Sequence, residues 1–146
     1  MARIPRVFFD TKVIFSGLYA SGGPPAWLLD GCVEGRAVML VSRQVLRELV
    51  RTVEVKVPAA LPALHTLLSN TGVEVVDDPT PEATARLAQG ASPDDAPILA
   101  AARMCGADYL VTGNVRHFAR AQEVEGSSLI VVTPAQLMRL LGWSRG

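Results

Sequence analysis

The sequence has few aromatic residues and no long hydrophobic run. Aromatic side chains make up 5% of the 146 residues, so the core must be aliphatic, which favours layers of sheet and helix over an aromatic-rich sandwich. No apolar segment reaches the roughly 18 to 20 residues that a membrane span needs, and no secretory leader is recognisable. We therefore expect a cytoplasmic protein with no membrane partner, folded as one domain over residues 1–146.

Cysteine and net charge are also low. Cys32 and Cys105 form no CxxC pair and no Cys/His cluster, so we expect two buried, reduced thiols within separate helices. The formal net charge is zero, and no global charge indicates a nucleic-acid partner. Of the 14 basic residues 12 are arginine, but guanidinium groups suit phosphate and surface carboxylates equally well, so this excess is weak evidence.

Short apolar runs alternate with helical patterns along the chain. The runs typical of buried parallel strands are residues 7–9, 37–41, 73–76, 109–112 and 129–132. Helical patterns begin at Pro25, after the N-cap Ser42 and at Asp95, and cover 58–71, 81–88 and 134–141. This alternation predicts right-handed βαβ crossovers and an α/β fold with a mostly parallel sheet.

Acidic residues stand where predicted strands end and helices begin. Asp10 closes the first strand, at the sheet edge where α/β proteins usually bind ligands, although it could also cap a turn. Asp95 opens an alanine-rich helix, where the helix dipole favours a carboxylate anyway, and the pattern does not choose between Asp95 and Asp94. Glu48 has the pattern of a solvated helix residue, and Asn114 that of a turn residue. No single residue establishes a site.

In combination, these segments resemble the PIN-domain family, most closely the toxin components of VapC-like toxin–antitoxin systems. The resemblance spans nearly the whole chain and rests on six ordered motifs, Arg6–Thr11, Gly22–Pro25, Ser42–Glu48, Asp95–Ala102, Thr112–Phe118 and Val132–Pro134. It implies a three-layer α/β/α fold with a central, mostly parallel sheet. It further implies a Mg²⁺- or Mn²⁺-dependent endoribonuclease that hydrolyses RNA, pairs with a cognate antitoxin protein and forms a homodimer.

The resemblance also implies roles for individual residues. Asp10, Glu48 and Asp95 match the catalytic, metal-binding acids, and Asn114 stands where many relatives have a fourth aspartate ligand. Thr112 matches a small hydroxyl residue that supports the cleft. Oxygen ligands of this kind select Mg²⁺ or Mn²⁺, which can activate water for attack on a phosphodiester. Whether one or two ions bind is left open.

Further charged residues adjoin these positions. Asp94 would support the site beside Asp95. Arg116 and His117 could contact substrate phosphate, although a loop anchored by Phe118 explains their position at least as well. In the terminal helix, the apolar residues through Leu141 are assigned to the core, and the following Trp143 is a candidate contact residue.

The first motif departs from the family pattern. It reads Asp10-Thr11-Lys12, where the family usually has asparagine in the third position. Residues two apart in an extended segment point to the same side, so Lys12 could pair with Asp10 and weaken metal binding. Alternatively, Lys12 turns outward and contacts substrate phosphate. The first case predicts a weakened, Mn²⁺-preferring or inactive nuclease.

Other functions fit parts of the sequence. An inert PIN-like module that binds RNA or a protein partner would keep the fold and bind no metal. A phosphatase of the haloacid dehalogenase type also starts with an apolar strand ending in aspartate, but it needs a second acid where Lys12 stands. A dinucleotide-binding domain is disfavoured further, because Ser21–Pro24 lacks the GxGxxG spacing. We rank the active nuclease first, the inert module second and the phosphatase third.

Overall fold

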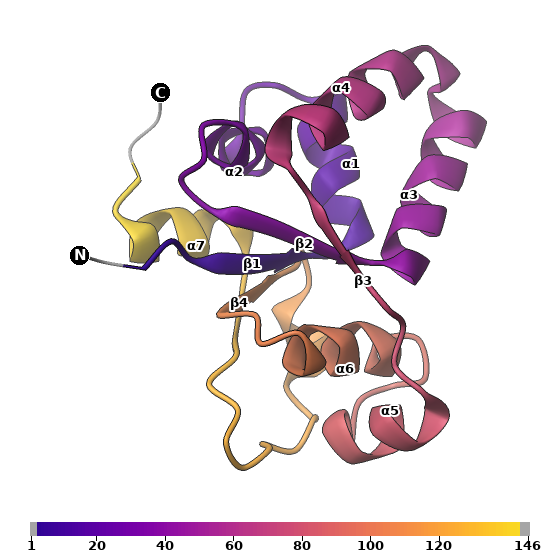
Figure 1. The fold of residues 1–146 in the computed structure, drawn as a ribbon, viewed down its shortest axis with the longest axis vertical. Helices are drawn as coiled ribbons and strands as arrows, with labels where there is room; N and C mark the ends of the chain where they lie inside the picture. The colour runs from indigo at the N-terminus through magenta and orange to yellow at the C-terminus, as the bar shows by residue number, and fades with distance from the viewer. Residues whose placement is uncertain (1–2, 144–146) are drawn as a thin grey trace.

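Five parallel strands form the central sheet of the protein, whose computed structural model describes residues 3–143. Their order across the sheet is β3-β2-β1-β4-β5, and every neighbouring pair is parallel (Figure 1). The strands are β1 (Arg6–Phe9), β2 (Val38–Ser42), β3 (Glu74–Val76), β4 (Tyr109–Val111) and β5 (Ile130–Val132). The predicted parallel sheet is confirmed.

Helices cover both faces of this sheet, as the three-layer α/β/α fold requires. The elements are α1 (Thr11–Tyr19), α2 (Pro24–Val33), α3 (Arg43–Lys56), η1 (Pro58–Ala60), α4 (Leu61–Thr71), α5 (Pro81–Leu87), α6 (Ala96–Met104), η2 (Val115–Phe118) and α7 (Pro134–Leu141). Helices α1 to α4 lie on one side of the sheet, with α7 against α2, whereas α5 and α6 pack together on the other side (Figure 1).

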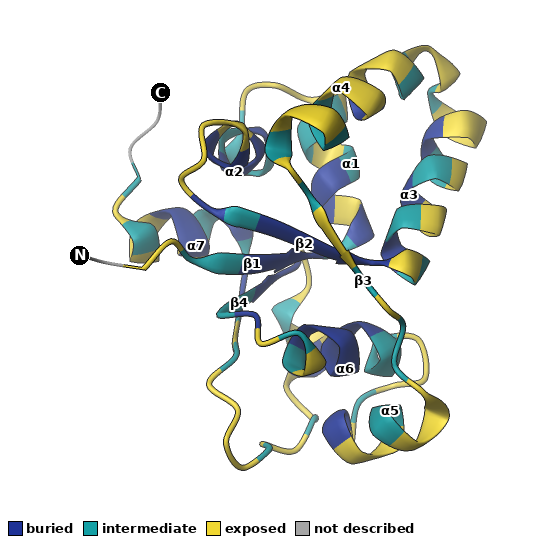
Figure 2. Ribbon diagram, in the orientation of Figure 1, coloured by how far each residue is buried: buried dark blue, intermediate teal, exposed yellow. Residues whose placement is uncertain are grey.

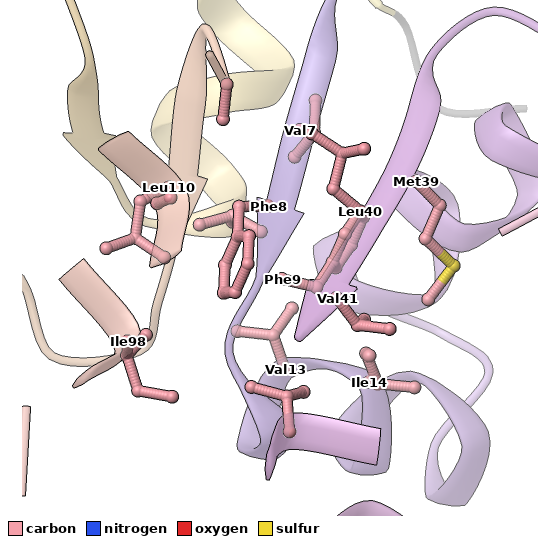
Figure 3. Packing of buried hydrophobic residues seen from close by; sticks show 14 of the residues in the cluster. Val7, Phe8, Phe9, Val13, Ile14, Met39, Leu40, Val41, Ile98 and Leu110 are labelled. Carbon is pink, nitrogen blue, oxygen red and sulfur yellow. The ribbon is translucent and has the colours of Figure 1, made fainter. Parts of the chain in front are cut away.

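The core lies on both sides of the three central strands. Phe8 in β1 is paired with Leu40 in β2 and Leu110 in β4, and all three side chains are fully buried. Val13 and Ile14 of α1 join the same cluster beside the strands (Figure 3). The edge strand β3 and the outer faces of α3 and α4 are exposed instead (Figure 2). Burial of each such large apolar side chain contributes about 1.5–3 kcal/mol, which stabilises the three central strands.

Local sequence signals set several boundaries of the helices. The Ser42 hydroxyl accepts a hydrogen bond from the backbone N–H of Val45 at 3.2 Å, so Ser42 caps α3 as predicted. Gly72 ends α4 with a φ of 61°, a left-handed conformation that favours glycine. Thr133 and Gln136 form a reciprocal capping box at the start of α7.

The main departure from the sequence analysis is α1, which was not expected. Asp10 is its N-cap residue and the helix begins at Thr11, so the extended geometry considered for residues 10–12 is wrong. Val13 and Ile14 are buried against the sheet, and this packing accounts for the helix. Lys12 therefore lies on the first turn of a helix, with its side chain exposed.

Smaller corrections concern the cysteines and the C-terminal region. Both thiols are free, but Cys105 is only half-buried and follows α6, whereas Cys32 is buried inside α2. Leu140 is 58% exposed and does not belong to the core. Trp143 is half-buried and packs on α2, with the Arg36 guanidinium 4.4 Å from its ring centroid. Within residues 3–143, no helix is long and apolar enough to cross a membrane.

Candidate active site

A cavity of about 810 Å³ opens at the carboxyl edge of the sheet. The end of β1, the helix α3, the segment before α6 and the turn η2 all contribute to its wall. Its charged lining consists of Asp10, Glu48, Asp94, Asp95, Lys12, Arg116, Arg120 and the titratable His117. The fold thus brings the predicted acids together from three separate parts of the sequence.

Asp10 is held at the inner end of this cavity by the neighbouring strand. Its Oδ2 accepts a hydrogen bond from the hydroxyl of buried Thr112 at 2.9 Å, and its backbone N–H donates to Val111 at 3.1 Å. Burial raises the pKa of Asp10, and the Asp95 carboxylate adds to this rise. The hydrogen bond from Thr112 and the charge of Lys12 lower the pKa of Asp10. Ionising Asp10 therefore costs free energy, and these two groups offset part of that cost.

Glu48 projects from α3 and is positioned by two neutral donors. Thr11, just after Asp10, donates its hydroxyl hydrogen to Oε2 at 3.2 Å. Gln44, one turn earlier on the same helix, donates to Oε1 at 3.1 Å. Within residues 3–143, no cation lies within 4.0 Å of this exposed carboxylate. Both donors orient the Glu48 carboxylate without neutralising its charge.

The structure distinguishes Asp95 from Asp94. Asp95 is the N-cap residue of α6, is half-buried, and accepts a hydrogen bond from the Ser92 hydroxyl at 2.7 Å. Its charge also acts on Asp10 across the cavity. Asp94 lines the same cavity but is exposed. The electrostatic link to Asp10 makes Asp95 the better partner.

Asn114 does not line the cavity, unlike the other predicted ligands. Its backbone N–H donates to the Thr112 hydroxyl at 3.2 Å, and its side-chain nitrogen lies 2.9 Å from Nε2 of His117. The other ring nitrogen of His117 lies 3.8 Å from Asp95. Asn114 therefore contacts His117, and this ring connects it with the acid Asp95. Phe118 is buried and anchors η2, as the structural alternative expected.

Lys12 lines the cavity with Asp10 and lowers the pKa of that carboxyl. Among the described side chains, however, no carboxylate lies within 4.0 Å of its ammonium group. The structure thus combines parts of both alternatives, because Lys12 is close enough to act electrostatically but does not form an ion pair with Asp10.

Several cavity residues were missed by the sequence analysis. Gln44 could have been found from its spacing of four residues before Glu48, and Ser92 from its spacing of three residues before Asp95. Arg120 carried no local signal. Its backbone oxygen would lie 2.4 Å from a Cβ at Gly90, so only glycine lets these two segments of the wall approach so closely.

The acids do not form a ready-made cluster. Within residues 3–143, no three His, Cys, Asp or Glu side chains are close enough together to hold a metal ion. The donor chemistry nevertheless fits Mg²⁺ or Mn²⁺, since all the candidate ligand atoms are oxygens. Such ions also retain several waters and need few protein ligands. A cation between Asp10 and Asp95 would relieve their mutual repulsion.

Solved structures with a similar fold include two VapBC proteins and the protein PAE2754. VapBC2 from Rickettsia felis, bound to a DNA fragment from its promoter, aligns with a TM-score of 0.64 at 19% identity over 88% of this chain and 98% of its own. DNA-bound VapBC from Salmonella typhimurium gives 0.62 at 19% identity, covering 87% and 98%. PAE2754 from Pyrobaculum aerophilum gives 0.62 at 22% identity, covering 98% and 93%. These likenesses establish the fold.

The sequence itself establishes the family. The family model PIN_3, described as PIN domain, matches residues 6–116, which include β1, α3 and α6 with all the acids of the cavity. The chain therefore belongs to the PIN-domain family. No curated protein matches it significantly.

Proposed function

We propose that the protein is a divalent-metal-dependent endoribonuclease. The observation that carries this proposal is the gathering of Asp10, Glu48 and Asp95 on one cavity at the carboxyl edge of a PIN-domain sheet, held by neutral donors. Since carboxylates without partner cations repel one another, the cavity favours a hard cation. Bound Mg²⁺ or Mn²⁺ would supply the Lewis acidity that phosphodiester hydrolysis needs.

The surrounding residues would keep these ligands in place. Thr112 orients Asp10, Thr11 and Gln44 orient Glu48, and Ser92 orients Asp95, each through a side-chain hydrogen bond. Fixed ligand orientation matters because neighbouring hydrogen bonds tune metal affinity. Asp94 would add negative charge at the entrance, and Asn114 would act through His117.

Basic side chains of the cavity would bind the substrate backbone. Arg116, His117 and Lys12 line the wall around the acids, and Arg120 adds a further guanidinium. A planar guanidinium group can bind two phosphate oxygens at once, so Arg116 and Arg120 suit the phosphates of the substrate backbone.

The biological role that we propose is that of the toxin in a toxin–antitoxin pair. Two of the structural relatives are VapBC complexes, which supports a cognate antitoxin protein as partner. We further propose a cytoplasmic homodimer, in line with the family resemblance. The phosphatase alternative loses its support, because the family match leaves no reason to assign Asp10 to that chemistry.

A second candidate is an inert PIN-like module that binds RNA or a protein. Two observations favour it, namely the absence of a ready-made three-ligand cluster within residues 3–143 and the position of Lys12 in the cavity. Metal binding separates the two candidates. An active nuclease binds Mn²⁺ at the acids, whereas the inert module folds and binds none.

The first experiment is calorimetric titration of the wild-type protein with Mn²⁺, alongside Asp10→Asn and Asp95→Asn. Asp77→Asn is the matched control, because Asp77 is an exposed acid already paired with Arg43 at 2.9 Å. We expect binding that both cavity substitutions abolish and the control preserves, followed by Mn²⁺-dependent cleavage of single-stranded RNA. A folded wild-type protein without heat of binding would favour the inert module.

A further inference from the structure

A groove of about 500 Å³ leads away from the carboxylates between α1 and α3. It shares Asp10, Lys12 and Glu48 with the main cavity, so the two depressions meet at the acids. Beyond this junction, Arg51 and Lys56 of α3 contribute the further charges of the groove. The acids are thus confined to one end, and the path leading from them is positively charged.

The basic residues of this groove differ from others on the same helix. Arg43 and Arg47 of α3 pair with the acids after β3, at 2.9 Å and 3.2 Å. Among residues 3–143, by contrast, no carboxylate lies within 4.0 Å of the charged groups of Arg51 or Lys56. Their charge therefore remains available to an anionic ligand.

Phe15 of α1 supplies the aromatic ring of the groove, and Tyr19 beside it lines a neighbouring depression. Phe15 lines the groove and stacks on Tyr19, with ring centroids 6.0 Å apart and planes inclined by 17°. The ammonium group of Lys56 lies 5.9 Å from the centroid of Phe15. Tyr19 is 71% exposed although it is a large, partly apolar residue. Cations interleaved with aromatic rings are the combination that binds single-stranded nucleic acid, through phosphate contacts and base stacking.

We propose that the groove between α1 and α3 holds the single-stranded RNA next to the scissile phosphodiester. Arg51 and Lys56 contact its phosphates, and Phe15 stacks with a base. This inference rests on the proposed function, because it requires an RNA strand that crosses the acids. It assigns substrate-positioning roles to residues of α1 and α3 that lie outside the acidic cavity.

Fluorescence anisotropy with a single-stranded oligouridylate of about 12 nucleotides, within the site sizes of such grooves, tests the proposal. EDTA in the buffer prevents metal-dependent cleavage, and salt is varied between about 50 and 200 mM. We expect Arg51→Gln/Lys56→Gln to bind roughly 10-fold more weakly at low salt. The slope of log affinity against log salt should also fall by about 1.4, since each phosphate contact on a single strand contributes about 0.7.

The matched control is Arg43→Gln/Arg47→Gln, which removes the same two charges from α3 outside the groove. Its affinity and salt slope should equal those of the wild type, and thermal melting verifies that each variant is folded. Phe15→Leu should weaken binding roughly 5-fold or more without changing the slope, because stacking releases no counterions.

The outcomes separate this inference from the proposed nuclease activity. If the wild-type protein cleaves RNA but Arg51→Gln/Lys56→Gln binds RNA as tightly as the wild type, the proposed RNA groove is wrong and the nuclease proposal stands. The groove would then be a candidate site for a protein partner. An equal loss in both double variants would reduce the effect to net charge and also overturn it. Absence of Mn²⁺ binding would contradict the nuclease, whereas the anisotropy readout in EDTA does not depend on metal.

Discussion

Acidic residues at the amino edge of the sheet have cationic partners, whereas those of the cavity at the carboxyl edge have neutral partners. At the amino edge, Asp108 accepts the backbone N–H of Arg6 at 2.8 Å and bonds the Arg3 guanidinium. Arg6 also reaches Glu74 at 3.4 Å and donates to the backbone oxygen of Cys105 at 3.2 Å. Every acid in this group has a cationic partner, and the cluster ties together the starts of the strands.

At the carboxyl edge, the acids of the cavity have neutral partners. Asp10 and Asp95 accept hydrogen bonds from the hydroxyl groups of Thr112 and Ser92, and His117 comes no closer to Asp95 than 3.8 Å. Neutral donors orient a carboxylate but leave its charge available to a ligand. We infer that the ionic pairing of an acid, more than its presence at a strand end, distinguishes the structural acids from the candidate metal ligands.

Position at the carboxyl edge is not sufficient by itself. Asp77 and Asp78 also follow a strand at this edge, but Arg43 and Arg47 neutralise them. Asp78 in addition accepts the backbone N–H of Gln44 at 2.9 Å, near the start of α3. These two acids brace α3 against the end of β3, and we assign them no catalytic part.

The largest expected effect comes from removing a cavity acid. Asp10→Asn or Asp95→Asn should lower Mn²⁺-dependent RNA cleavage by roughly 10²–10³-fold, the range for removing one essential electrostatic group. Asp77→Asn, at the same edge, should retain wild-type cleavage. Single-turnover rates on a labelled RNA measure the difference. Equal losses in all three variants would erase the distinction between paired and unpaired acids.

Breaking the amino-edge cluster should affect stability and leave activity intact. Asp108→Ala leaves the Arg6 backbone N–H and the Arg3 guanidinium without their acceptor, which should lower the free energy of unfolding by about 1–2 kcal/mol. Urea denaturation measures this loss. Cleavage per folded molecule should match the wild type, and a specific loss of cleavage would mean that the two edges are coupled.

Asp10→Asn should stabilise the fold at neutral pH although it lowers activity. Burial raises the pKa of Asp10, so the native state binds its proton more tightly than the unfolded chain does, and ionisation costs stability as pH rises above the ordinary value of 3.8. The amide avoids that cost. We expect the melting temperature to be roughly 2–4 °C higher at pH 7, about 1 kcal/mol for a chain of this size.

The pH dependence provides the control for this effect. The advantage of Asp10→Asn should shrink as pH falls through the raised pKa and vanish below 3.8, where the wild-type carboxyl is protonated in both states. Asp77→Asn should show no such trend. A constant difference at every pH would assign the stabilisation to packing instead of charge.

The smallest expected effect concerns Lys12. Lys12→Asn removes a positive charge from the cavity without breaking an ion pair, so Mn²⁺ affinity should rise roughly 2- to 5-fold at low salt and less at high salt. Calorimetry measures it, with Lys56→Asn as a control that removes a charge farther from the acids. Unchanged affinity and cleavage would show that Lys12 does not weaken the site.

The sequence predicted most of the helices and strands but missed α1. The strands, the capping by Ser42 and the stop at Gly72 follow from local patterns, and each boundary lies within a residue or two of the observed one. Helix α1 was missed because the sequence analysis assigned no element to Thr11–Tyr19 and considered only extended geometry for residues 10–12, whereas Val13 and Ile14 of this helix are buried.

Within the candidate site, the sequence by itself determined which chemistry is available. It supplied acids at the ends of strands and helices, because strand ends and helix caps are encoded locally, and it carried the PIN-domain motifs. Only the tertiary structure decided which acids are neutralised. It paired Asp77 and Asp108 with arginine, left Asp10 with a hydroxyl partner and turned Asn114 to His117, because such pairings depend on contacts between residues far apart in the chain.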